Sequence, residues 1–102
     1  MERYNGWANR ATWLTTLWMD EYRFSAYFEA RAKELLQEYD EREARYNLAT
    51  EIESLIENEI VNPIMRQIEC CYFYHYFDDM SGTTFHQIDY LEIAEHYMDN
   101  IR

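Results

Sequence analysis

Turn-forming residues are scarce in this chain, which contains two glycines and one proline among 102 residues. A sandwich or barrel of many strands needs frequent tight turns, and those turns depend on glycine and proline. Apolar residues make up 48% of the chain, which is too many for an acidic segment that stays unfolded. A chain of this length can bury about two-thirds of its unfolded surface in one domain. We therefore expect residues 1–102 to form a single compact all-α domain of four to five helices.

Apolar residues at helical spacing predict two helices in the first part of the chain. Asn9 is a good N-cap residue, and the first helix is expected to run from there to about Glu21. The second is expected from about Phe24 to Asp40, because its apolar residues recur at steps of three and four. The residues expected to form the apolar faces are Trp13, Leu14, Leu17 and Trp18, and then Phe24, Phe28, Ala32, Leu35 and Tyr39.

A third helix is predicted from about Ala44 to Val61. No glycine or proline separates it from the second, so the two helices are either continuous or joined by a short turn. A rotation of about 100° per residue places Glu51, Glu53 and Glu57 outside its apolar stripe and Glu59 within it. Glu59 is then either a helix-end carboxylate that reaches water or a residue with a specific buried or interface contact. The apolar stripe consists of Leu48, Ala49, Ile52, Leu55, Ile56 and Ile60.

Two more helices are predicted after the break at Asn62-Pro63. Pro63 suits the first position of a helix that continues to about Asp79. This helix carries six consecutive rings at residues 72–77, which point to all sides, so that some must pack in the core while others lie at the surface or in an interface. Asp89 and Glu92 then have capping-box spacing, which predicts a last helix from Tyr90 to about Ile101.

Negative charge is concentrated in the second half of the chain. There are 20 Asp and Glu against 9 Lys and Arg, a formal net charge of −11. Residues 51–102 hold eleven acids and two bases (net −9), whereas residues 1–50 hold nine acids and seven bases (net −2). Nucleic-acid backbones and anionic membranes would repel such a chain. We therefore expect a basic protein partner, bound mainly by the second half.

Two segments resemble a family of small acidic proteins of unknown function. Tyr4-Asn5-Gly6-Trp7-Ala8-Asn9-Arg10-Ala11-Thr12-Trp13, followed by Leu17-Trp18, resembles the pattern YNGWxNxxTWxxxLW that opens this family. Residues 88–96 are similar to its C-terminal segment. The family occurs in bacteriophages, plasmids and other mobile elements, so the resemblance implies a mobile-element origin.

The chain departs from that family just after the Leu-Trp pair. Residues 20–24 contain no glycine, although the family usually has a short glycine-bearing turn there. Within the tryptophan motif, large rings and a capping asparagine are typical of a small core and its first helix, so a structural role is expected for all five of its main residues. They are Trp7, Asn9, Thr12, Trp13 and Trp18.

Catalytic and metal-binding motifs are missing from the sequence. It has no phosphate-binding glycine loop, HExxH helix, CxxC pair or nucleophile elbow. Cys71 and His75 can share a helix face, but a zinc site would need further ligands from distant residues. Cys70 and Cys71 are adjacent and are expected to be free thiols in a reducing cytoplasm, and Glu92 and His96 are expected to form an ion pair. We expect no enzymatic activity, cofactor or metal.

An acidic helical surface with aromatic anchors fits a protein groove that normally binds DNA. DNA carries about one negative charge per 1.7 Å of axis, and such grooves are lined with Arg and Lys. We therefore expect a DNA-mimicking inhibitor of anti-restriction or anti-CRISPR type, acting in the bacterial cytoplasm on a host defence protein. It would not bind nucleic acid or membranes itself, and a homodimer is left open. The alternative is a phage or plasmid accessory protein that regulates replication, transcription or packaging without mimicking DNA. The residues expected to bind the partner are the acidic Glu51, Glu53, Glu57, Glu59, Glu69, Asp78 and Asp79 and the aromatic Tyr72, Tyr74 and Tyr76.

Overall fold

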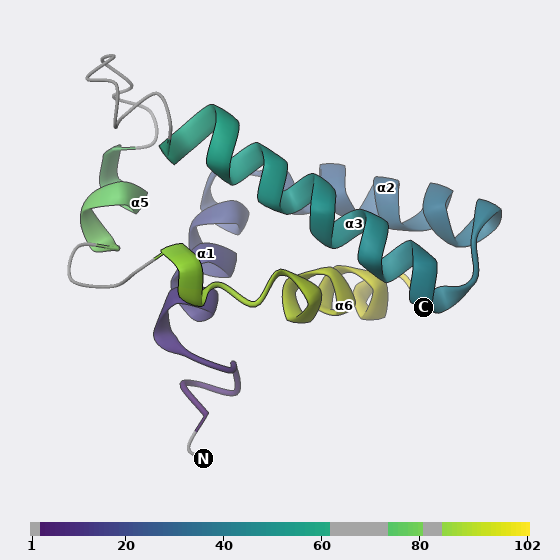
Figure 1. Ribbon diagram of the computed structural model, residues 1–102, viewed down its shortest axis with the longest axis horizontal. Coiled ribbons are helices and arrows are strands. Elements are labelled where there is room, and N and C mark those ends of the chain that lie inside the picture. The colour runs from purple at the N-terminus through teal and green to yellow at the C-terminus, as the bar shows by residue number, and fades with distance from the viewer. Residues whose placement is uncertain (1–2, 62–73, 81–84) are drawn as a thin grey trace.

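Three helices, α2 (Phe24–Glu38), α3 (Glu41–Leu55) and α6 (Tyr90–Asn100), pack against one another and form the centre of the fold. The computed structural model describes residues 3–61, 74–80 and 85–102, without the side chains of Tyr74, Phe77 and Asp78. Figure 1 shows α3 crossing in front of α2 and running beside α6. The described residues contain helices and one isolated bridge but no strand, so the predicted all-α fold is confirmed.

Helix α1 (Arg10–Glu21) begins where the sequence predicts, and its predicted apolar face is confirmed in part, because Leu14 is buried and Trp13 and Trp18 pack against the core. The Asn9 side chain caps it by accepting a hydrogen bond from the Thr12 amide (2.8 Å). Leu17, expected in the apolar face, is 49% exposed, whereas Thr15 and Thr16 are buried. Both hydroxyls donate to carbonyl oxygens one turn earlier in the helix, which satisfies them without water. Small hydroxyl residues therefore share the core side of α1 with apolar residues such as Leu14 and Met19.

Helix α5 (Tyr74–Asp79) packs on α1. The Tyr76 ring is fully buried, and its hydroxyl lies 2.7 Å from the Thr15 hydroxyl oxygen. The Trp18 indole donates to the Asp79 carboxylate (2.7 Å), and its ring stacks on His75 at 6.2 Å between centroids. The predicted helix from Pro63 to Asp79 is thus observed only at its end, and its earlier part lies outside the described residues.

A short turn separates α2 from α3, which decides between the two arrangements that the sequence left open. Tyr39 and Asp40 both have extended backbone, and the Asp40 carboxylate accepts a hydrogen bond from the Glu43 amide (2.8 Å). This is N-capping geometry, so a new helix begins at Glu41, three residues before the predicted start. The two helices are not continuous.

The end of the predicted third helix is a π-helix, η1 (Ile56–Val61). A π-turn contains more residues than an α-turn, so each residue rotates by less than the roughly 100° of an α-helix. The smaller rotation keeps Ile56 and Ile60 in the core and moves Glu59 out of the apolar arc. Glu59 is accordingly exposed.

The two segments that carry the family resemblance contact each other. The Thr12 hydroxyl accepts a hydrogen bond from the Asp89 amide (2.9 Å), and the Asn9 amide group donates to the Gln87 carbonyl (2.6 Å). Glu92 accepts from the Ala8 amide (2.8 Å) and pairs with Arg3. The motif residues therefore join the N-terminal segment to the start of α6, after the short 3-10 helix η3 (Phe85–Gln87).

The start of α6 follows the predicted cap only in part. Asp89 accepts a hydrogen bond from the Glu92 amide (3.1 Å), which confirms Asp89 as the N-cap residue. Glu92, however, bonds to Ala8 and Arg3, and His96 lies edge-on to Trp7, with centroids 5.0 Å apart. Both residues thus bind the N-terminal segment, which replaces the expected ion pair between them.

Candidate functional site

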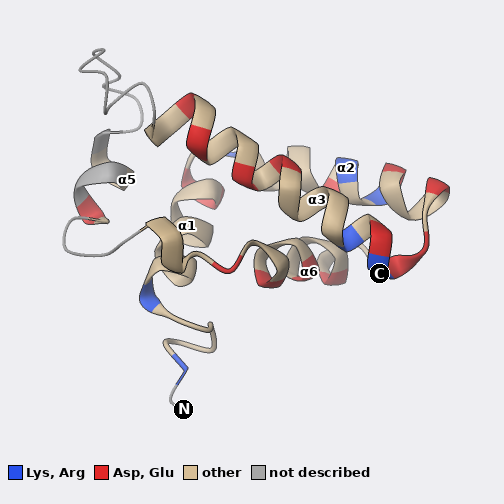
Figure 2. Ribbon diagram, viewed as in Figure 1, with Lys and Arg blue, Asp and Glu red and all other residues tan. Residues whose placement is uncertain are grey.

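Two carboxylates of α3 and η1 form an exposed acidic surface on the side of α3 that faces Tyr90. Glu53 and Glu57 are both exposed. Burial first, and then the nearby carboxylates of Glu53 and Glu57, raise the pKa of the Tyr90 hydroxyl. In Figure 2 acidic residues recur along α3 toward its C-terminal end, while its basic residues lie near its start. We call Glu53 and Glu57 the acidic pair.

Glu51 differs from the acidic pair because it is neutralised within the chain. The Arg31 guanidinium donates two hydrogen bonds to the Glu51 carboxylate (2.9 and 2.7 Å) and one to Glu34 (2.6 Å). These bonds raise the pKa of Arg31, so it stays charged. Glu51 is half-buried and its charge is balanced by Arg31, so it presents less free negative charge than the acidic pair does.

Glu53, Glu57 and Glu59 are exposed carboxylates with no cation of the described residues beside them. Among the described residues, the ion pairs are formed by Arg3, Arg31, Arg45 and Arg102, and none of them involves Glu53, Glu57 or Glu59. A surface carboxylate without a counterion leaves its field available to a basic partner. At the C-terminal end of the described α3–η1 segment, the carboxylates without an ion pair are therefore these three, and Glu43 near its start is a fourth.

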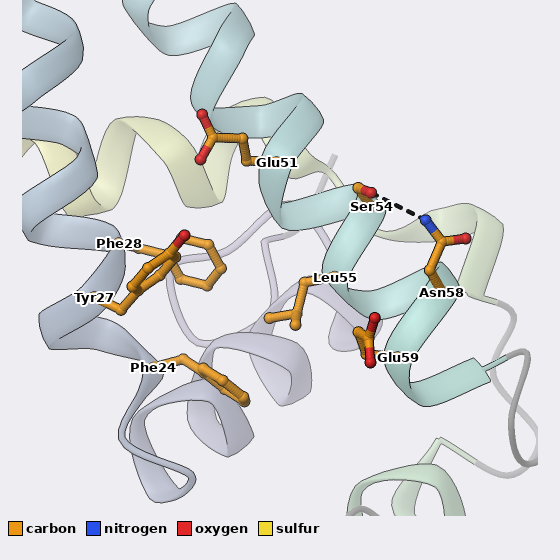
Figure 3. Close-up of a pocket in the computed structure, with 8 residues that line it drawn as sticks. All are labelled: Phe24, Tyr27, Phe28, Glu51, Ser54, Leu55, Asn58 and Glu59. Carbon is orange, nitrogen blue, oxygen red and sulfur yellow. Dashed lines mark hydrogen bonds between the residues drawn. The ribbon is translucent and has the colours of Figure 1, made fainter.

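A cleft opens between α2 and the C-terminal part of α3 with η1, and its volume is about 470 Å³ (Figure 3). Aromatic rings from α2 form one wall, and Leu55 with Glu59 forms the opposite one. Tyr27 is 58% exposed, whereas Phe28 beneath it is buried. We call this cavity the α2–α3 cleft. Its lining residues are Phe24, Tyr27, Phe28, Glu51, Ser54, Leu55, Asn58 and Glu59.

Of the aromatic anchors expected from residues 72–77, the structure describes the side chain of Tyr76, which is not at the surface. Tyr76 is a core residue, because its ring is fully buried and its hydroxyl bonds to Thr15. Asp79 is exposed, but it accepts a hydrogen bond from Trp18. Outside the described part lie Glu69, Tyr72 and the side chains of Tyr74 and Asp78.

Sequence reasoning missed the aromatic wall of the cleft. Tyr27 lies beside the apolar stripe of its helix rather than on it, so the helical pattern does not indicate it. A large aromatic ring outside the stripe is the sequence signal that points to it. Glu59 was noted as an anomaly, but the π-helix that directs it to the cleft has no sequence pattern.

The described residues offer no evident metal centre. Within residues 3–61, 74–80 and 85–102, no three His, Cys, Asp or Glu side chains lie close enough together to hold a metal ion. Cys70 and Cys71, which the zinc alternative would need, are outside these ranges. In the same ranges no helix has the length and apolarity needed to cross a membrane. What the arrangement offers chemically is negative charge next to exposed aromatic rings.

Comparison with known proteins gives a family but no activity. No curated protein and no solved structure matches the chain. A family match extends from the first residue to the last, and it includes both the tryptophan motif and the segment before α6 that bonds to it. Over residues 1–102 the chain belongs to the family of unknown function DUF7249.

Proposed function

We propose that this protein is a non-enzymatic inhibitor, made by a mobile genetic element, that binds a nucleic-acid-handling defence protein of a bacterial host. Its acidic surface would occupy the basic groove in which the target normally holds DNA or RNA. The mobile-element origin rests on the resemblance of residues 4–18 and 88–96, and the targets considered are restriction and CRISPR nucleases.

The observation that carries this proposal is the uncompensated acidic pair on a chain of net charge −11. Glu53 and Glu57 are one helical turn apart, exposed, and without a basic partner among the described residues. Such charges accelerate association with a basic surface more than they add to affinity, and salt screens them. A basic nucleic-acid-binding groove is the surface that this charge fits.

The test compares two double variants that lose the same charge at different places. Glu53→Gln/Glu57→Gln removes the acidic pair, and Glu21→Gln/Glu38→Gln removes two exposed carboxylates of α1 and α2. Each protein is expressed in bacteria that carry one defined restriction or CRISPR system, and phage plating efficiency is measured. We expect the wild type and the control variant to raise plating, and the acidic-pair variant to lose at least tenfold of that gain.

Assays with the purified protein and nuclease then distinguish mimicry of DNA charge from other ways of blocking the nuclease. The protein is expected to compete with duplex DNA for the responsive nuclease, and its inhibition is expected to weaken as the salt concentration rises. Equal inhibition by the two double variants would rule out the acidic pair as the blocking surface.

An exposed apolar surface between α3 and α6 favours the second candidate, an accessory interaction protein of a phage or plasmid. Tyr46 is 64% exposed and Leu91 is 44% exposed. Both residues line two neighbouring surface pockets, one that includes Glu53 and Tyr90 and one that includes Tyr39. Exposed aromatic and aliphatic residues are typical anchors of protein interfaces. Partner binding that is lost in Tyr46→Ala but unaffected by salt would favour this candidate over the inhibitor.

A further inference from the structure

We propose that the α2–α3 cleft binds an arginine side chain of the basic partner, with the guanidinium against the Tyr27 ring and paired with Glu59. The inference deepens the proposed function, since it names the group that the partner inserts. It is tested below without that partner.

The shape of the cleft suits a long side chain with a flat charged end. Its volume of about 470 Å³ lies in the range of small-ligand sites. Figure 3 shows Phe24, Tyr27 and Phe28 projecting from α2 toward Leu55 on α3. The aliphatic part of an arginine can pack on such rings while its planar end stacks on an exposed one.

The charge of the cleft selects a cation. Glu59 is exposed, lines the cleft, and forms no ion pair with any basic residue of the described chain. An anionic ligand would be repelled, whereas a cation gains from the carboxylate and from the faces of the rings. One uncompensated negative charge beside aromatic rings is complementary to one guanidinium.

The other end of the cleft already contains such a pair. Arg31 from α2 donates two hydrogen bonds to Glu51 on α3, so that this carboxylate is satisfied. Glu51 and Glu59 line the same cavity, but only Glu51 has an arginine of the described chain bound to it. An incoming arginine would repeat at Glu59 the contact that Arg31 makes at Glu51.

The π-helix places Glu59 at this position. In a continued α-helix Glu59 would fall in the apolar arc, whereas the wider turn of Ile56–Val61 brings it to the cleft and keeps Ile60 buried. Single π-turns within helices are found frequently at functional sites. The backbone irregularity and the unpaired carboxylate thus occur at the same residue.

The test titrates the ¹⁵N-labelled protein with N-acetyl-arginine amide and, in parallel, with N-acetyl-citrulline amide, which has the same shape without the charge. We expect saturable amide shifts at Phe24, Tyr27 and Glu59 with the arginine compound, and affinity at least fivefold weaker with citrulline. Glu59→Gln is expected to weaken arginine binding at least threefold, and so is Tyr27→Ala. The matched control, Glu38→Gln, removes an equal charge from an exposed position near the end of α2, outside the cleft, and should leave binding unchanged.

Several outcomes would overturn the inference. They are equal binding of the arginine and citrulline compounds, equal effects of Glu59→Gln and Glu38→Gln, or shifts confined to residues outside the cleft. The amide spectrum of each variant shows directly whether it is folded. If arginine binding fails while the acidic pair is still needed for inhibition, only this inference is lost. If arginine binds but no defence system is inhibited, the proposed function is the one that fails.

Discussion

Thr12 shows how much one side chain of the tryptophan motif contributes to the fold. Its hydroxyl donates to the Asn9 side chain (2.8 Å) and accepts from the Asp89 amide (2.9 Å), and the residue is fully buried. The sequence predicted a structural role for Thr12, but not that its partner would lie 77 residues away. That contact is tertiary, and no local pattern encodes it.

Replacing Thr12 by valine is expected to destabilise the protein by about 1–3 kcal/mol, because the Asp89 amide loses its buried acceptor. The measurement is urea unfolding followed by far-UV circular dichroism. Thr50→Val is the control, since the Thr50 hydroxyl donates to the Tyr46 carbonyl on an exposed helix face and its loss should change stability by no more than about 0.5 kcal/mol. Equal effects of the two substitutions would show that the Thr12 contact contributes nothing specific.

Arg23 occupies a backbone conformation that glycine adopts without strain. It precedes α2 with φ 68° and ψ 26°, in the left-handed region, and no glycine is present there. A side chain with a Cβ costs about 1–2 kcal/mol in this region. The left-handed backbone therefore places a local strain at Arg23.

The substitution Arg23→Gly is expected to stabilise the protein by about 0.5–1 kcal/mol, since relief of the strain exceeds the added entropy of the unfolded chain. Thermal unfolding measures the gain. Arg23→Ala removes the charge but keeps the Cβ, so it should give no gain. If alanine stabilises the protein as much as glycine does, the charge rather than the backbone is responsible.

At the scale of elements, the sequence predicted which helices exist better than it predicted their buried faces and their ends. Helices α1, α2, α3 and α6 are all present where apolar spacing and caps indicate them. The buried face of α1 was predicted only in part: Leu17 is exposed, and Thr15 and Thr16 are buried because the helix itself satisfies their hydroxyls. The π-turn of η1 was not predictable, since it depends on how Ile56 and Ile60 fit the core rather than on local composition.

The N-cap at Asp40 is the feature that makes α2 and α3 two separate helices rather than one continuous helix. Asp40→Ala removes the acceptor of the Glu43 amide and is expected to cost about 1 kcal/mol, measured by urea unfolding. Glu38→Ala, an exposed carboxylate near the end of α2, is the matched control and should be nearly neutral. A neutral Asp40→Ala would mean that the packing of α2 and α3 alone determines the turn.

At the scale of the whole molecule, the charge count indicated the sign of the partner but not the surface that binds it. Figure 2 shows acidic residues on all the principal helices, and some of them are neutralised inside the chain, as Glu51 is by Arg31. Which carboxylates stay unpaired depends on which arginines reach them across helices. Of the predicted acidic residues in the described α3–η1 segment, Glu53, Glu57 and Glu59 are the ones without an ion pair among the described residues.

The buried tyrosines make the stability of the whole molecule sensitive to alkali. Burial is the largest cause that raises the pKa of Tyr76, Tyr90 and Tyr97 above the ordinary value of about 10. The hydrogen bond with the Thr15 hydroxyl lowers the pKa of Tyr76, but by less than burial raises it. The Tyr97 hydroxyl has no hydrogen-bond partner among the described residues. In the unfolded chain all three would ionise at the ordinary pKa.

Stability is therefore expected to be fully present below about pH 10 and to fall as pH rises further, because above that value the unfolded state binds fewer protons than the folded state. Each tyrosine that stays protonated only in the folded state contributes a loss of about 1.4 kcal/mol per pH unit. Urea unfolding between pH 8 and about pH 11.5 measures the slope. Tyr76→Phe removes one of these groups, so its slope should be shallower by about 1.4 kcal/mol per pH unit than that of the wild type, whatever its effect on stability at pH 8. A profile that stays flat above pH 10, or one that Tyr76→Phe leaves unchanged, would mean that Tyr76 ionises as readily in the folded protein as in water and is not held in the core.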